Sequence, residues 1–380
     1  MKPGAPGQAR QAVRVPAGLH RQSRFFAATV GLWRRLGDLE SAVLRELTEP
    51  LPIDRPIYVT SLPRSGTTIV TELLDQHPEL TSHRYSDFPN VWTPYWRNYL
   101  LQRTRRRAPE KVERAHRDRI RVSNDSPEAV EELLWMHFFP RVHAPGEKQV
   151  LEAADRNPEF DAFYADAIRK LLAVRNARRY LAKGNYNVAR IGYILSLFPD
   201  ARLLVPVRRP VDHIASLMKQ HELFTRDSRE DPRIPLQLAL SGHFEFGPGR
   251  RFVHFGDQAE SDAIANAWSG GREVEGWARY WAATYRHLLE GIEQDAGRGR
   301  ACLVFSYEAL CEDSESMIDR ILAHCELPST GFENTRQRFA RNLSLPDYYE
   351  PQFTDGEREL IHDHCSEVFD RLGALFPRTV

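Results

Sequence analysis

The segment from Ile57 to Pro78 places hydroxyl groups, a glycine and an arginine between an apolar stretch and a helix-like stretch. It reads IYVTSLPRSGTTIVTELLDQHP. In the order strand, turn, helix, backbone N–H groups and the positive end of a helix dipole lie at the turn, and both favour a bound phosphate. We interpret this turn as an anion-binding loop formed by Arg64, Ser65, Gly66, Thr67 and Thr68. An ordinary Ser/Gly turn that caps a helix is the alternative.

The loop differs from the ATP-binding loop at the position that grips a triphosphate. The ATP pattern G-x-x-x-x-G-K-[ST] has a lysine directly after its second glycine, and this lysine reaches the β and γ phosphates. Aligned on Gly66, the chain has Thr67 in place of that lysine, and its cation is Arg64, upstream of the glycine. Backbone amides, two threonines and one guanidinium suit a single terminal phosphate better than a triphosphate.

A second candidate anion site lies in the stretch LLVPVRRPVDHIASLMKQ. We expect a strand to end at Val207, Arg208 to occupy the exit turn, and Pro210 to stand in the first turn of a helix. Ser216 follows Arg208 by eight residues. Roughly two helical turns return its hydroxyl to the same edge, where it would converge with the guanidinium on one anion. Two phosphate sites on one sheet edge indicate a nucleotide phosphorylated at both ends.

The elements that would position these residues alternate along the chain. Apolar segments of strand length occur near Ile57, Tyr180, Leu204 and Val304, with helical patterns between them. This alternation predicts an α/β fold, in which helices flank a central parallel β-sheet. Residues 221–271 contain glycines, prolines and histidines, and we expect them to form a long insertion over the ligand-binding edge of the sheet.

The N-terminal region divides into two parts. Residues 1–20 are rich in Gly, Pro and Arg, and we expect a disordered tail there, followed by a single domain over residues 21–380. An apolar stripe then follows helical spacing and ends before Pro50; its members are Val30, Trp33, Leu36, Val43 and Leu47. This stripe would pack on its own domain, or it would contact a membrane surface or a second copy of the chain, so a homo-oligomer stays open.

Composition excludes several classes of protein. Lys plus Arg and Asp plus Glu both number 52, so no net charge favours nucleic acid as a partner. The longest apolar run near the N-terminus, FFAATVGLW, is too short to cross a bilayer, and no secretory leader pattern precedes it. We therefore expect a cytoplasmic protein without a transmembrane segment. The four cysteines show no C-x-x-C spacing, which favours reduced, mostly buried thiols.

Three motifs together resemble those of the PAPS-dependent sulfotransferases of bacterial type, which take a sulfuryl group from 3'-phosphoadenylyl sulfate (PAPS). The motifs are LPRSGTT, VRRPVDHIASL and VFSYEAL, and the resemblance spans roughly Ile57 to the C-terminus. It implies a P-loop-NTPase-like three-layer sandwich, with Arg64 to Thr68 on the 5'-phosphosulfate and with Arg208 and Ser216 on the 3'-phosphate. Tyr307 matches a family position near the bound nucleotide. A tyrosine that ends a buried strand is the alternative for Tyr307.

The implied reaction needs charge stabilisation and a base. Sulfuryl transfer depends on in-line positioning and on cations and amides, so we expect no metal ion and release of 3',5'-ADP. Cytosolic members of the family place a histidine base two residues after a lysine, but here Lys183 is followed by Asn185, whose amide cannot take a proton. In tyrosylprotein and heparan-type members a glutamate serves as base, and Tyr85 stands at that position. We predict Asp87, the nearest carboxylate, as the base.

The remaining site predictions carry alternatives. His83 is the second candidate for the base, and Lys183 is expected to act as a cation on the bridging oxygen or on the transferred group. A capping role for Asp87 and a solvated strand-end role for Lys183 are the structural alternatives. The acceptor would be a glycan, a lipid, a peptide tyrosine or a small hydroxylated metabolite; the arginine-rich residues 103–107 would suit an acidic glycan.

Two further functions stay open at this point. An ATP-dependent small-molecule kinase with an atypical loop would require magnesium, and Thr67 at the lysine position speaks against it. A nucleotide-binding module without catalysis would bind 3',5'-ADP, yet none of its properties would depend on Asp87, His83 or Lys183.

Overall fold

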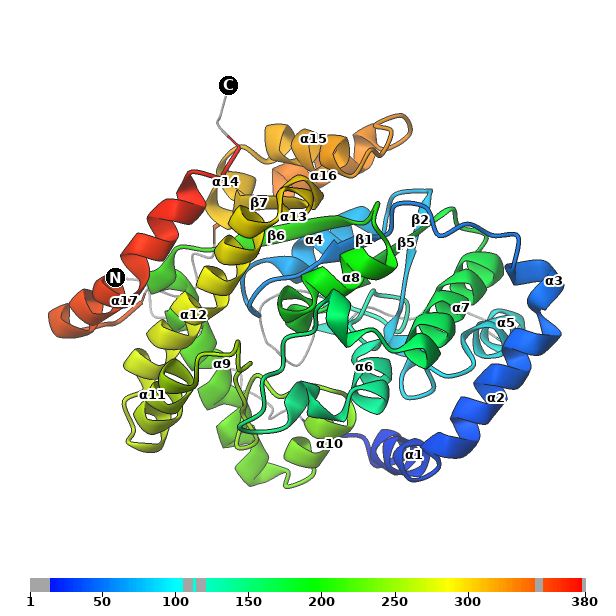
Figure 1. Ribbon diagram of the computed structural model, residues 1–380, viewed down its shortest axis with the longest axis horizontal. Helices are drawn as coiled ribbons and strands as arrows, with labels where there is room; N and C mark the ends of the chain where they lie inside the picture. The colour runs from blue at the N-terminus through cyan, green and yellow to red at the C-terminus, as the bar shows by residue number, and fades with distance from the viewer. Residues whose placement is uncertain (1–13, 105–111, 114–120, 346–350, 378–380) are drawn as a thin grey trace, which may run out of the picture.

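The centre of the molecule is a five-stranded sheet whose neighbouring strands all run parallel (Figure 1). The structure is a computed structural model that describes residues 14–104, 112–113, 121–345 and 351–377. The strand order is β2-β5-β1-β6-β7, and the strands are β1 (Ile57–Val59), β2 (Leu80–Ser82), β5 (Arg179–Lys183), β6 (Arg202–Val207) and β7 (Cys302–Ser306). The predicted parallel sheet is confirmed. β2 was missed because three residues, LTS, carry too little apolar signal. A separate two-stranded pair joins β3 (Val112–Glu113) and β4 (Arg121–Val122).

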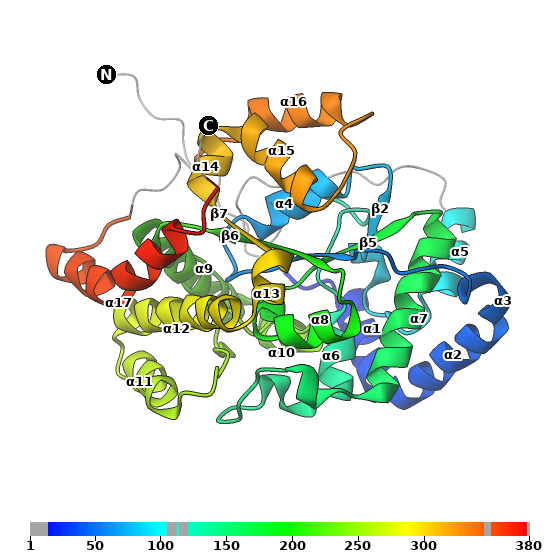
Figure 2. The ribbon, with the colours of Figure 1, turned by 45° about the horizontal axis from the view of Figure 1, so that its top comes forward.

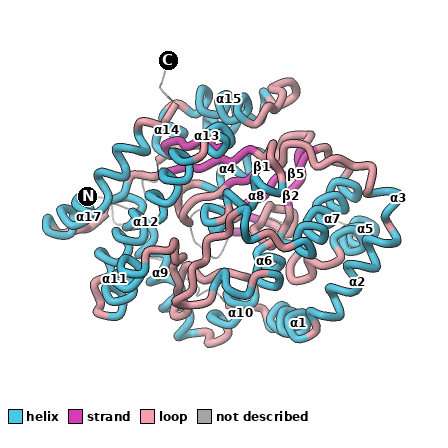
Figure 3. The backbone as a smooth tube through the Cα atoms, in the orientation of Figure 1, coloured by secondary structure: helices cyan, strands magenta, loops and turns pink. Residues whose placement is uncertain are grey.

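Helices cover both faces of the sheet, as Figures 2 and 3 show. The strands are buried on both sides: Ile57 and Val59 belong to one apolar cluster, and Tyr58 between them belongs to the other. The first face is covered by α4 (Thr67–Leu74), α14 (Tyr307–Glu312), α15 (Ser314–His324) and α16 (Glu333–Asn342). The second cluster takes in residues of α6 (Glu132–Phe138), α7 (Pro158–Arg175), α8 (Ile191–Leu197), α9 (Pro210–Glu230) and α12 (Glu273–Gln294). This three-layer arrangement is the one that the sequence pattern predicts.

The remaining elements lie at the periphery. The helices among them are α1 (Ala17–Ala28), α2 (Val30–Val43), α3 (Arg45–Thr48), α5 (Pro94–Thr104), α10 (Ile234–Leu240), α11 (Gln258–Ser269), α13 (Ala296–Ala301) and α17 (Asp355–Gly373). Short 3₁₀ turns span Tyr85–Asp87, Pro140–His143, Ala153–Asp155 and Asn185–Ala189. None of the helices within the described ranges combines the length and the apolar character needed to cross a membrane. The four cysteines form no disulfide.

The N-terminal helices differ from the predicted stripe. Val30 and Trp33 pack against the core, but Val43 is 64% exposed and Leu47 is 48% exposed. The contact surface of α2 is instead built around a buried ion pair, in which Lys170 Nζ lies 3.2 Å from Glu40 Oε2. Apolar periodicity cannot reveal such a pair. α1 begins at Ala17, inside the expected disordered tail, whereas residues 1–13 of that tail and residues 105–107 of the arginine-rich stretch lie outside the described residues.

The expected insertion is only partly irregular. α9 continues to Glu230 and is followed by α10 and α11, so most of residues 221–271 are helical. The irregular part is residues 241–257, which we call the α10–α11 loop. Its Phe244 N–H donates to the Tyr186 hydroxyl at 2.9 Å, just beyond the end of β5. This loop therefore does lie at the carboxyl edge of the sheet, where ligands bind in open parallel sheets.

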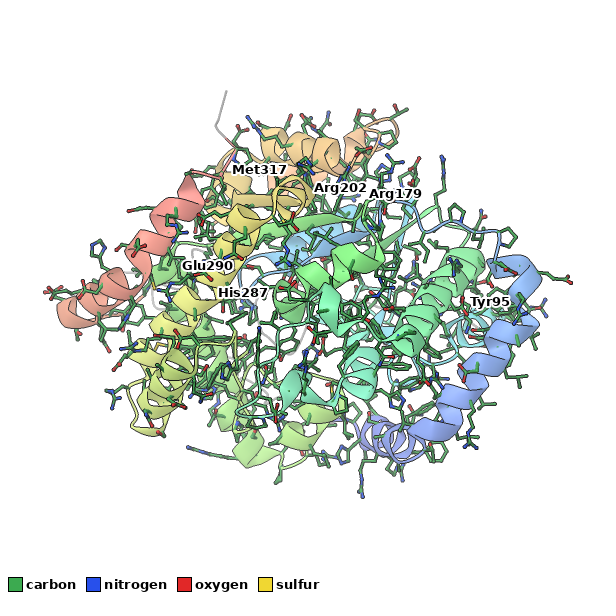
Figure 4. All side chains as sticks on the ribbon, in the orientation of Figure 1. Tyr95, Arg179, Arg202, His287, Glu290 and Met317 are labelled. Atoms are coloured by element: carbon green, nitrogen blue, oxygen red, sulfur yellow. The ribbon has the colours of Figure 1, made fainter. Side chains whose placement is uncertain are left out.

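The opposite edge of the sheet carries arginines with structural roles. Figure 4 labels Arg179 and Arg202, which begin β5 and β6 below α15. Arg179 donates to the Cys325 carbonyl oxygen at 2.7 Å, and Arg202 donates to the His324 carbonyl oxygen at 3.2 Å. Both guanidinium groups thus stabilise the C-terminal end of α15, where the helix dipole favours cations. The arginines that are candidates for ligand binding lie at the carboxyl edge.

Candidate functional site

The loop between β1 and α4 has the geometry of an anion cradle. Gly66 precedes the first residue of α4 and has a φ of 105°, which lies in the region that favours glycine. Arg64 also has a positive φ, of 74°. Ser65 is fully buried, and its Oγ has no hydrogen-bond partner among the described residues. A buried hydroxyl without a hydrogen-bond partner at the N-terminus of a helix fits an anionic ligand, which would accept a hydrogen bond from it.

All three sequence motifs meet at this loop. Arg64 Nε donates to the Ser216 Oγ at 3.3 Å, across 152 residues of chain. The Arg208 guanidinium lies 5.8 Å from the centre of the Tyr307 ring. The same ring packs against Gly66, because a Cβ added there would lie 2.5 Å from Tyr307 Cδ2. The carboxyl ends of β1, β6 and β7 therefore bring these residues together, as the sequence predicts for the two anion sites.

Gly66→Ala is expected to lower the free energy of unfolding by about 1–3 kcal/mol, the cost of a strained backbone conformation. The added methyl group would also collide with Tyr307. Urea unfolding measures the change. Gly249→Ala is the matched control, because no atom lies within 4 Å of its added Cβ. Equal stabilities of the two variants would contradict a strained, closely packed Gly66.

A buried histidine supports the loop from below. The Trp281 indole N–H donates to His213 Nδ1 at 3.1 Å, so His213 Nε2 carries a proton and donates it to the Pro63 carbonyl oxygen at 2.8 Å. Burial is the main cause that lowers the pKa of His213 to about 3; the positive charges of Arg208 and Arg64 act in the same direction, and the hydrogen bond to Pro63 acts against it. His213 is therefore neutral and positions the loop. No sequence pattern indicates this role, because the partners of His213 are far away in the chain.

Lys183 ends β5 beside the loop. It pairs in the sheet with Val59, the last residue of β1, and its side chain is 9% exposed. Lys183 Nζ lies 3.2 Å from Glu128 Oε1, and Tyr85 also hydrogen-bonds to the Glu128 carboxylate. Burial acts to raise the pKa of Glu128, but Lys183, His243 and Tyr85 together hold it well below its usual range. Lys183 is therefore fixed by a buried carboxylate and is not a solvated strand-end lysine.

Glu128 is a site residue that was not predicted from the sequence. Its N–H donates to the His83 carbonyl oxygen at 2.9 Å, and an antiparallel bridge joins Arg84 to Pro127. This pairing carries Glu128 to the end of β5, which lies more than fifty residues further along the chain. No local motif announces such a contact.

Comparison with known proteins now decides the family. Residues 56–240 match the model of the sulfotransferase family. This segment, which makes up just under half of the chain, belongs to the sulfotransferase family. The matched range contains the loop, Lys183 and both residues of the second motif, and it ends before Tyr307. The chain is accordingly a transferase. A comparison with curated protein sequences finds no match.

One solved sulfotransferase structure shares the fold of this chain, and two further ones are less similar to it. Sulfotransferase STF9 from Mycobacterium avium is 17% identical over 87% of this chain and 80% of its own, with a TM-score of 0.50. STF1 from Mycobacterium tuberculosis H37Rv is 15% identical over 86% of this chain and 81% of its own, with a TM-score of 0.45. A sulfotransferase from Alicyclobacillus acidocaldarius is 16% identical over 86% of this chain and 98% of its own, with a TM-score of 0.40.

Asp87 has structural partners in this sulfotransferase. Its side chain is 1% exposed and lies 2.8 Å from the guanidinium of Arg175. Asn98 Nδ2 donates to Oδ1 at 3.0 Å, and the Arg84 N–H donates to Oδ2 at 2.8 Å. Burial acts to raise the pKa of Asp87, but Arg175 and His83 hold it far below its usual range. This arrangement leaves Asp87 poorly suited to take a proton from an acceptor and supports its role as a turn cap.

His83 belongs to the same buried cluster. Its Nδ1 lies 3.4 Å from Asp87 Oδ2, and only 3% of the residue is exposed. Its ring packs edge-on against Tyr180 in β5, with the centroids 6.1 Å apart. The structure thus places Lys183, predicted as a cation for the transfer, beside the loop, and it buries the two predicted bases, Asp87 and His83, together with Arg175.

Proposed function

We propose that this sulfotransferase moves the sulfuryl group of PAPS to an acceptor hydroxyl. The observation that carries the proposal is the hydrogen bond between Arg64 and Ser216, which joins the two anion motifs. PAPS carries a phosphosulfate on its 5' side and a phosphate on its 3' side, so two linked anion sites on one sheet edge match its charge distribution. ATP carries all its phosphates on one side and would leave the second site empty.

In this proposal each part of the donor meets a specific group of residues. The loop amides of residues 65–68 and the hydroxyl of Ser65 bind the 5'-phosphosulfate, and the two threonines line the same turn. Arg208 and Ser216 bind the 3'-phosphate, for which a guanidinium is well suited. Tyr307 keeps the loop closed over Gly66 and faces the nucleotide.

Arg64 and Lys183 supply the positive charge for the transfer. In an in-line displacement, negative charge grows on the equatorial oxygens and on the bridging oxygen that leaves with the 5'-phosphate. Arg64 would stabilise the charge on the equatorial oxygens, and Lys183 would stabilise the charge on the bridging oxygen. Glu128 would hold the ammonium group of Lys183 in place. These two cations would make the transfer independent of a metal ion. The acceptor is a hydroxylated small molecule, glycan or lipid.

The nucleotide selectivity of two arginine variants tests the proposal. By titration calorimetry, the parent protein is expected to bind 3',5'-ADP at least about tenfold more tightly than 5'-AMP, because a charge-assisted contact contributes about 1.5–3 kcal/mol. Arg208→Ala should lose this preference. Arg209→Ala is the matched control, because Arg209 is exposed and lies 3.0 Å from Asp212. A parent protein without the preference, or a retained preference in Arg208→Ala, would refute the donor site.

Transfer itself is measured with ³⁵S-labelled PAPS and a panel of acceptors in the presence of a chelator. Labelled product from the parent protein is expected. A parallel reaction with γ-³²P-labelled ATP and magnesium, without the chelator, tests the kinase alternative, which ³²P-labelled product together with no transfer from PAPS would establish.

A further inference from the structure

The α10–α11 loop brings a histidine and a glutamate to the carboxyl end of β5. His243 Nδ1 lies 3.5 Å from Glu245 Oε2. The other oxygen of Glu245 accepts a hydrogen bond from Asn185 Nδ2 at 3.1 Å. The Asn185 carbonyl oxygen in turn accepts from Thr60 Oγ1 at 3.4 Å, and Thr60 is the first residue after β1. A series of contacts therefore connects His243 to the start of the loop between β1 and α4, which we call the donor loop.

Neighbouring side chains anchor this loop. The Phe244 ring is buried and packs against His143, with the ring centroids 4.5 Å apart. Phe246 is also buried. The Arg250 guanidinium lies 3.8 Å from the ring centre of Trp268 and forms an ion pair with Glu273 at 2.6 Å. These contacts, on both sides of His243 and Glu245, fix the two side chains over the edge of the sheet.

The charges around His243 suit a proton acceptor. Glu245 from the same loop and Glu128 from the segment before α6 attract its charged form, whereas Lys183 from β5 repels it. Burial lowers the pKa of His243, but the two carboxylates outweigh burial and Lys183, so the pKa lies above its usual value. Its side chain is 33% exposed, compared with 3% for His83, so an acceptor can reach it. Among the described residues, no hydrogen bond engages Nε2.

We propose that His243 is the general base of the sulfuryl transfer and that Glu245 is its positioning residue. This inference rests on the proposed function. Neutral His243 donates its Nδ1 proton in a hydrogen bond to Glu245, and its Nε2 lone pair takes the proton of the acceptor hydroxyl. The acceptor oxygen forms a bond to sulfur while the bond between sulfur and the bridging oxygen breaks. The electron pair of that bond leaves with 3',5'-ADP, and the imidazolium later releases its proton to solvent.

Glu128 is a weaker candidate for this role. Its carboxylate already accepts from Lys183 and Tyr85, and its pKa lies well below the usual range, so it binds a proton poorly. A base works best when its pKa is near the working pH, which a histidine satisfies and a strongly acidic carboxyl group does not. Asn185 stands where the family resemblance expects a histidine, and it holds Glu245 instead.

The test uses His243→Gln in the full-length protein with ³⁵S-labelled PAPS and an acceptor that the parent enzyme sulfates. We expect kcat to fall about 10²-fold or more, the usual contribution of a general base. The dissociation constant for 3',5'-ADP should stay within about twofold, because His243 does not contact the donor site. His362→Gln, which alters an exposed histidine on α17, is the matched control and should retain full activity.

The pH profile separates a base from a structural residue. Because the neutral imidazole is the active form, kcat/KM of the parent enzyme should rise with pH through the pKa of His243. Glu245→Gln removes a charge that stabilises the imidazolium, so the rising limb should move to lower pH. In His243→Gln the rise of kcat/KM with pH should disappear.

Two results would overturn the inference. One is a His243→Gln variant with the kcat and rising limb of the parent enzyme. The other is loss of the limb in Glu128→Gln but not in His243→Gln, which would assign the base to Glu128. Failure of the parent protein to bind 3',5'-ADP or to transfer label is a different outcome, because it refutes the proposed function and the inference with it.

Discussion

Arg64→Ala is expected to lower kcat/KM for sulfuryl transfer about 10²-fold to 10³-fold, the cost of removing one preorganised electrostatic contact to the transition state. Arg64 stands inside the donor loop at a positive φ, and its Nε bonds to Ser216. Its guanidinium is thus held at the junction of the two anion sites. The loss should appear in initial rates measured over a range of PAPS concentrations.

Two companion variants separate the charge of Arg64 from its hydrogen bond. Ser216→Ala removes the bond to Nε and the proposed contact to the 3'-phosphate but leaves the guanidinium in place, so at saturating PAPS we expect kcat to fall less than about tenfold, in line with one neutral hydrogen bond. Arg64→Lys keeps the positive charge but lacks the planar guanidinium, so its loss of activity should lie between those of Arg64→Ala and Ser216→Ala. Equal losses in Arg64→Ala and Ser216→Ala would mean that Arg64 acts through the loop structure and not through its charge.

Asp87→Ala is expected to destabilise the protein by about 3–5 kcal/mol, because it removes the carboxylate that neutralises the buried charge of Arg175. Asp87 and Arg175 are 1% and 5% exposed, and their charged atoms lie 2.8 Å apart. The pKa of Asp87 is lowered in the folded state, so this stabilisation is present at neutral pH and is lost only as the pH falls below the ordinary range of a carboxyl group. Urea unfolding at pH 7 gives the difference.

Asp166→Ala is the control for this measurement. Asp166 is 38% exposed and pairs with Arg169 at 3.3 Å, an exposed ion pair that contributes at most about 1 kcal/mol. A nearly unchanged stability of Asp87→Ala, combined with a kcat about 10²-fold lower, would contradict the structural role. It would restore the prediction, made from the sequence, that Asp87 is the catalytic base.

The predictable parts of the molecule are those encoded by neighbouring residues. β1, the loop and α4 follow one another directly, so strand, glycine and helix signals predicted the cradle at Gly66. The placement of the two anion motifs on one edge was also predictable, because parallel strands bring their carboxyl ends there, but Ser216 accepts a hydrogen bond from Arg64, whereas its expected neighbour was Arg208. The acceptor side was not predictable. Glu128 and His243 reach β5 from different loops, and their placement depends on tertiary pairing that no short motif encodes.

The role of Asp87 also depends on a residue that is distant in the chain. Its position in the chain suggested a base, but its partner Arg175 lies 88 residues away, and a carboxylate changes its role when a buried guanidinium saturates it. A carboxylate by itself therefore identifies neither an acid, a base nor a cap. The charged groups around a carboxylate determine which of these roles it has.

The packing of Tyr307 on Gly66 has a consequence for how the chain can be divided. The range that matches the family model ends at residue 240, but the cradle depends on Tyr307, the first residue of α14 directly after the last strand, and on Trp281 through His213. A fragment that stopped at residue 240 would lack β7 and so would expose the edge of β6 that pairs with it. It would also lack Tyr307, which packs on Gly66, and Trp281, which holds His213 under the cradle. Recognition of the donor is thus a property of nearly the whole polypeptide, and the segment that is easiest to recognise in the sequence is not an autonomous folding unit.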